Sequence, residues 1–132
     1  MIVDSSVFVA VLMAEPGADE LSDLLESERI SVSAATLTEC TIVLHGKGGE
    51  EKTLAFNELL RLTRATVVPL DEAQARLASD AYRRYGRGSG HPARLNYGDC
   101  FSYALAITRD EPLLFKGDDF IHTDVRRVPS GR

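Results

Sequence analysis

The stretch MIVDSSVFVAVLMA, residues 1–14, decides the fold class. Its first three residues are apolar and include two β-branched side chains, which favours a short buried strand. The Asp-Ser-Ser run that follows can cap a helix, and the apolar residues after it continue that helix. A strand that passes directly into a helix indicates the beginning of an α/β protein.

Strand and helix signals alternate along the rest of the chain. We expect strands at 1–3, 29–35, 65–70, 111–117 and 125–129, and helices at 7–14, 18–28, 36–45, 50–64, 71–85 and in the segment that Asp99 opens. Gly46, Gly48 and Gly49 are expected to end the helix at 36–45. Strands separated by helices predict a mainly parallel sheet that is covered by helices on both faces.

Length and composition predict one domain over residues 1–132. With 44% hydrophobic and 27% charged residues, the chain has the composition of an ordinary globular protein with a buried core. Neither a membrane-spanning run nor a basic secretory leader is visible, so we expect a cytoplasmic protein without a membrane anchor. Cys40 and Cys100 are far apart in apolar segments, which favours buried thiols over a zinc motif or a disulfide.

The distribution of charge singles out one window. The formal net charge of -5 argues against nucleic-acid binding by bulk electrostatics, yet residues 81–98 contain no acid. The positive charges in this window are Arg83, Arg84, Arg87 and Arg94, with His91 beside them. Such a patch can hold phosphates, although a solvated helix end that runs into a glycine-rich loop has the same composition.

Acidic residues recur where a parallel sheet forms its sites. Ligands and catalytic groups gather at the carboxyl ends of the strands in such folds. The acids at these positions are Asp4 after the first strand, Glu39 one turn into a helix, Asp99 at the start of another helix, and Asp118 and Asp119 after the strand at 111–117. We therefore expect one acidic cluster assembled from distant parts of the chain.

Each acid also has a purely structural interpretation. Asp4 can cap a helix, Asp99 can cap one together with Asn96, and Glu39 can belong to a buried ion pair. Asp118 and Asp119 can be turn residues. The expected convergence of all these acids at one edge of the sheet favours a functional site over separate structural roles.

Clustered carboxylates without interleaved histidine or cysteine favour Mg²⁺ or Mn²⁺. Two such ions can activate a water and stabilise the leaving oxygen of a phosphodiester. Ser6 can hydrogen-bond a carboxylate or a metal-bound water, or it can be an ordinary first-turn serine. No serine-histidine-acid triad and no Walker loop is visible in the sequence.

Four stretches together resemble PIN-domain proteins, specifically the VapC-like toxins of bacterial toxin-antitoxin pairs. They are MIVDSSVFVAVL, SAATLTEC with Glu39, HPARLNYGDCFSYALA, and PLLFKGDDFIHTDV. The likeness spans nearly the whole chain. It implies a three-layer α/β/α sandwich and a magnesium- or manganese-dependent ribonuclease site.

Residue by residue, the resemblance assigns this site to Asp4, Glu39 and Asp99, with Asp119 before Phe120 as the fourth acid and Asp118 as its alternative. It also implies an RNA substrate guided by the basic loop, inhibition by a cognate antitoxin, and a homodimer.

Two other classes of protein remain as alternatives. An aspartyl-phosphate phosphatase or receiver domain also places acids after parallel strands, but the phosphatase needs an acid where Ser6 stands. A receiver needs paired acids after its first strand, where only Asp4 is present. A binding module that keeps the PIN fold without the chemistry is the third possibility.

Overall fold

The computed structural model describes residues 1–129. Its elements follow one another as β1 (Ile2–Val3), α1 (Ser5–Leu12), α2 (Ala18–Ser27), β2 (Ser31–Ser33), α3 (Ala34–Leu62), β3 (Thr66–Val68), α4 (Glu72–Tyr85), α5 (Tyr97–Arg109) and β4 (Leu113–Leu114). The four strands form one parallel sheet in the order β3-β2-β1-β4. The predicted mainly parallel α/β fold is confirmed.

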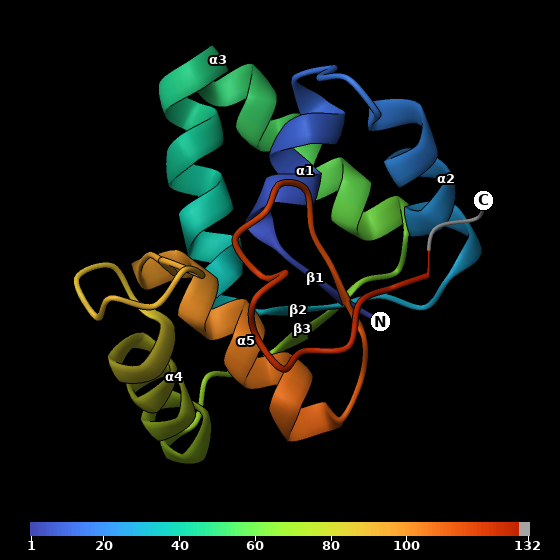
Figure 1. Ribbon diagram of the computed structural model, residues 1–132. Helices are drawn as coiled ribbons and strands as arrows, with labels where there is room; N and C mark the ends of the chain where they lie inside the picture. Colours follow the sequence, from blue (N-terminus) through green and yellow to red (C-terminus); the bar gives the residue numbers. More distant parts are fainter. Residues whose placement is uncertain (130–132) are drawn as a thin grey trace.

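Alternate strand residues divide the interior into two cores. Ile2 and Leu113 pack against α4 and α5 on one face of the sheet. Val3, Val32 and Leu114 pack against α1, α2 and α3 on the other face. Figure 1 shows the strands between these two groups of helices. The period of two along each strand therefore produces the three-layer sandwich.

Two expectations about secondary structure need correction. The first helix runs past Gly46 and Gly48, and the expected break before the next helix lies at Gly49, within α3, where φ is 71° and ψ is −159°. A positive φ is a conformation that glycine adopts without steric cost, so the break occurs there. Residues 125–129 do not form a strand. Arg127 makes only an isolated parallel bridge to Leu113, so no continuous strand pairing forms over this segment.

The strand order determines where a site can form. β2 and β4 flank β1 on opposite sides, so the direction of winding reverses between β1 and β4. A crevice opens at such a reversal, at the carboxyl ends of the strands. Asp4 directly follows β1, and residues 115–120 follow β4. No helix within residues 1–129 is long and apolar enough to cross a bilayer.

Candidate active site

Asp4 lies at the centre of the site and is 2% exposed. It is the N-cap of α1, and the backbone N–H of Ser6 donates to its Oδ2 at 3.1 Å. The hydroxyl of Ser102, on α5, donates to its Oδ1 at 2.6 Å. Burial raises the pKa of the Asp4 carboxyl, and the hydrogen bonds from Ser102, Ser6 and the Ser5 backbone oppose that rise.

Glu39 approaches Asp4 from α3. Burial raises the pKa of its carboxyl, the negative charge of Asp4 raises it further, and a hydrogen bond with Ser5 lowers it. Its Oε1 is buried without a hydrogen-bond partner. The carboxylate lies against Gly98, where a Cβ atom would come within 2.0 Å of Oε2. Glycine at position 98 thus leaves the space that Glu39 occupies, and the buried ion pair considered for Glu39 is absent among residues 1–129.

Asp99 stands in the first turn of α5, where it forms a capping box. Its Oδ2 accepts from the backbone N–H of Asn96, and its own N–H donates to Asn96 Oδ1, both at 2.9 Å. Burial raises the pKa of Asp99 to about 7 despite the Asn96 bond, and the charges of Asp4 and Asp119 add to the rise. The capping role foreseen for Asp99 is real, and it coexists with a place beside two other acids.

Asp119 contacts Asp99, whereas Asp118 is not among the groups within residues 1–129 that act on Asp99. A side-chain hydrogen bond with Asp119 favours the protonated form of Asp99. Both aspartates are exposed, while Phe120 beside them is 2% exposed and packs against Phe115 at a centroid distance of 5.1 Å. The buried phenylalanine therefore fixes the loop that presents Asp119. We call Asp119, Asp99, Asp4 and Glu39 the acid row, in the order in which a hydrogen bond or an electrostatic effect links them.

The acid row is not a preformed metal cage. Among residues 1–129, no group of three or more Asp, Glu, His or Cys side chains could hold a metal ion as it stands. The donors nevertheless suit a hard cation, because all are carboxylate oxygens and Glu39 Oε1 lacks any other partner. Burial is the main cause of the raised pKa values of Asp4, Glu39 and Asp99, and neighbouring negative charge adds to the rise at Glu39 and Asp99. A metal ion on these acids stays a prediction.

The four arginines of the basic window have different surroundings. Arg83 pairs with Asp80 at 3.2 Å on the exposed face of α4. Arg84 donates to the Tyr85 hydroxyl at 2.7 Å. Arg87 and Arg94 instead line a hollow of about 230 Å³ together with Asp118, Asp119 and His122. Only Arg87 and Arg94 border the acid row.

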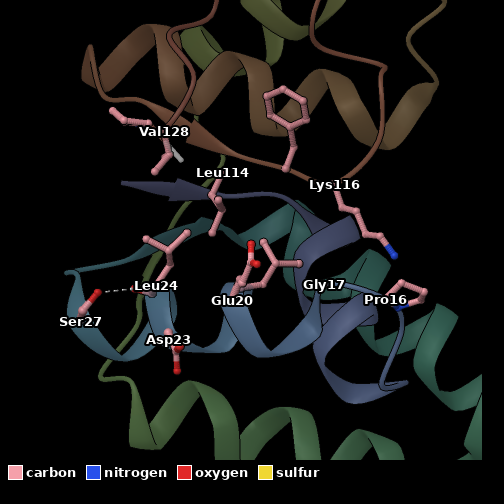
Figure 2. A pocket seen from close by; sticks show the side chains of 12 residues that line it. Pro16, Gly17, Glu20, Asp23, Leu24, Ser27, Leu114, Lys116 and Val128 are labelled. Atoms are coloured by element: carbon pink, nitrogen blue, oxygen red, sulfur yellow. Dashed lines mark hydrogen bonds between the residues drawn. The ribbon is translucent and has the colours of Figure 1, made fainter. Parts of the chain in front are cut away.

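Not every hollow lies beside the acids. One of about 650 Å³ separates α2 from the β4 segment and is lined by Leu24, Leu114 and Val128 among others. Figure 2 shows its side chains, with Lys116 at its rim. No member of the acid row lines it.

The sequence analysis missed Ser102 and Gly98. Ser102 follows Asp99 by three positions, so helical spacing puts the two on one face of α5, and this was the available signal. Both cysteines border the acids. Burial and the negative charge of Asp99 raise the pKa of Cys100 to about 11. Burial and the negative charges of Glu39 and Asp4 also raise the pKa of Cys40. Both are buried free thiols, as predicted.

Comparison with known proteins agrees with this geometry. The sequence matches the PIN domain family over residues 1–126. It is 50% identical over 129 residues to Ribonuclease VapC28 of Mycobacterium tuberculosis, an alignment that covers 97% of each chain.

Two solved structures share the fold. VapC20 of Mycobacterium tuberculosis, described as a toxin that cleaves the sarcin-ricin loop, superimposes with a TM-score of 0.76 at 18% identity and covers 96% of this chain and 97% of its own. VapBC-5 of the same organism, a member of the VapBC family of toxin-antitoxin systems, gives 0.66 at 24% identity over 96% and 97% of the two chains. At these identities the likeness concerns the fold alone.

Proposed function

The chain belongs to the PIN-domain family, within its VapC-like group, and from that premise we propose that it is a metal-dependent endoribonuclease that acts as the toxin of a toxin-antitoxin pair. The acid row carries the proposal. Four carboxylates from α1, α3, α5 and the loop after β4 gather at the carboxyl edge of the sheet, where Asp4 raises the pKa of Glu39, and Asp4 and Asp119 raise that of Asp99, in addition to burial. A fold that needed them only as helix caps would have no reason to bring them together.

In this proposal, Asp4 and Asp99 bind the principal Mg²⁺ or Mn²⁺, and Glu39 and Asp119 orient water or hold a second ion. The cation, when bound, supplies a nucleophilic water at neutral pH and neutralises charge on the phosphodiester. Ser102 fixes the Asp4 carboxylate through the 2.6 Å hydrogen bond. Asn96 fixes Asp99 through the capping box. These two contacts orient the acids before substrate arrives.

The substrate side of the proposal rests on the small hollow beside Asp119. Arg87 and Arg94 place two guanidinium groups at its wall, which suits the phosphate backbone of RNA. Ser6 hydrogen-bonds a carboxylate, which is one of the roles expected for it from the sequence. Its hydroxyl accepts from the backbone N–H of Lys116 at 3.0 Å and also hydrogen-bonds Asp4, so it ties the acid to the loop after β4.

The partners follow from the family. VapBC-5 is described as part of a toxin-antitoxin system, and we propose that a cognate antitoxin likewise inhibits this chain. We also propose that residues 1–132 form one domain, that the protein is a cytoplasmic homodimer, and that RNA is its substrate.

The test is cleavage of RNA by purified protein. Total RNA is incubated with the parent chain in millimolar magnesium or manganese, and again in EDTA, with Asp99→Asn prepared identically as a control for contaminating nuclease. We expect discrete fragments only from the parent with metal. Intact RNA under every condition would favour the alternative of a binding module without catalysis.

A further inference from the structure

A second hollow reaches Ser5 and Ser6, which hydrogen-bond Glu39 and Asp4 of the acid row. It measures about 430 Å³ and is bordered by α1, α3 and the loop after β4. Its polar and charged lining residues are Ser5, Ser6, Glu15, Lys47 and Lys116. Both lysines lie outside the basic window of residues 81–98.

Helix geometry connects this hollow to the acids. Val43 and Lys47 follow Glu39 at intervals of four residues, so the three side chains share one stripe of α3. Lys47 therefore lies about 12 Å along the helix axis from Glu39. On the facing helix, Ser5 hydrogen-bonds Glu39, and Val9 lies one turn farther along. The hollow thus extends from Ser5, beside Glu39, to Lys47.

The two lysines differ in their partners. Lys116 Nζ pairs with Glu15 Oε1 at 2.9 Å, with side chains 34% and 38% exposed. Lys47 is exposed and makes no ion pair among residues 1–129. The hollow therefore offers one cation without a counter-ion and a second whose acidic partner is open to water, where an ion pair contributes little to stability.

We propose that this hollow is a second RNA subsite, in which Lys47 and Lys116 hold a phosphate on the opposite side of the scissile bond from Arg87 and Arg94. The inference rests on the proposed nuclease function. The phosphate replaces Glu15 as the partner of Lys116, while Val9 and Val43 give the sugar an apolar floor. A single strand would then cross the acid row with a cationic contact at each end.

Glu15 makes the proposal sharply testable. If Lys116 serves only the ion pair, removing either partner has the same effect. If Lys116 binds phosphate, removing Glu15 frees the ammonium and removes a repulsive charge, so the two changes act in opposite directions.

The experiment measures binding of a fluorescein-labelled single-stranded RNA by anisotropy, in millimolar magnesium. All variants carry Asp99→Asn so that the RNA stays intact. We expect Lys47→Gln and Lys116→Gln each to weaken binding about 3- to 10-fold and to reduce the salt slope by about 0.7. We expect Glu15→Gln to tighten binding about 2- to 5-fold. Arg109→Gln, at the far end of α5, is the matched control and should change affinity less than about 2-fold.

The outcomes separate the subsite from the function. RNA cleavage by the parent together with unchanged affinity in both lysine variants overturns the subsite alone. Weakened binding in both Lys116→Gln and Glu15→Gln also overturns it, because that result assigns Lys116 to the ion pair. A parent that neither cuts nor binds RNA overturns both proposals. Circular dichroism melts verify that each variant is folded.

Discussion

The acid row and the basic loop at residues 86–96 meet at one small hollow, but they are built in opposite ways. Asp4 and Asp99 are buried and held by Ser102 and by the Asn96 capping box. Arg87 and Arg94 are exposed, and no hydrogen bond of their guanidinium groups exists within residues 1–129. The groups proposed for chemistry are thus oriented in advance, whereas those proposed to grip substrate retain their rotamer freedom. Four predictions test that contrast.

The largest effect is expected from Asp99→Asn. The amide keeps the shape and can still accept from the Asn96 N–H, but it removes a ligand charge. We expect cleavage to fall at least about 1,000-fold with the fold retained, measured by RNA cleavage and thermal melting. Asp19→Asn, at an exposed position in the first turn of α2, is the matched control and should stay within about 3-fold of the parent. Full activity in Asp99→Asn would break the assignment of Asp99.

The second prediction concerns pH in the absence of metal. The ordinary pKa of Asp99 is 3.8, and in the folded protein burial and neighbouring acids raise it to about 7. Between about pH 4 and pH 7, the folded protein therefore holds a proton that the unfolded chain has lost. The free energy of unfolding should fall as pH rises through this window, by at most about 1.4 kcal/mol per pH unit from this group.

Urea titrations in EDTA at several pH values measure this slope. Asp99→Asn should flatten it, because the titrating group is gone. A slope of the same size in that variant would assign the effect to groups other than Asp99.

The sequence predicted the buried half of this contrast better than the exposed half. Asp4 and Asp99 could be placed because each stands directly at a junction of strand or loop with helix, where topology fixes position. The partner of Asp4 could not, because Ser102 inside an apolar helix looks like any other small residue. The arginines were grouped by charge alone, which cannot show that Arg84 turns to Tyr85 while Arg94 faces the acids.

The sequence also could not show which of the glycines at 46, 48 and 49 interrupts the helix. Three glycines close together predicted the end of a helix, but only Gly49 has the positive φ that interrupts α3. Gly46 and Gly48 continue as helix, since tertiary packing of α3 against α1 outweighs their poor helix propensity.

The third prediction divides the arginines. The double change of Arg87 and Arg94 to Ala should weaken RNA binding about 10-fold and lower the salt slope by about 1.4, since each lost phosphate contact contributes about 0.7. The same double change at Arg83 and Arg84 should have a smaller effect, because these side chains already have partners in the protein. Binding isotherms at several salt concentrations test both. Equal losses would mean that the whole window grips RNA and that the contrast within it is wrong.

The smallest effect is expected from Glu39→Gln, and its sign is what matters. Glu39 lies near the negative charge of Asp4, its Oε1 has no hydrogen-bond partner, and no Lys or Arg pairs with it among residues 1–129. Neutralising Glu39 removes this repulsion and leaves no cation unpaired, so the free energy of unfolding of the metal-free protein should rise by about 0.5 to 1 kcal/mol. The expected rise is modest because water reaches this half-buried carboxylate and screens the repulsion. Magnesium should stabilise the parent more than the variant, because the parent presents one more carboxylate to the ion. Thermal melts of both proteins in EDTA and in millimolar magnesium decide the matter: a lower melting temperature for the variant in EDTA, with no magnesium-induced rise in the parent, would mean that the acid row is a structural network and not a metal site.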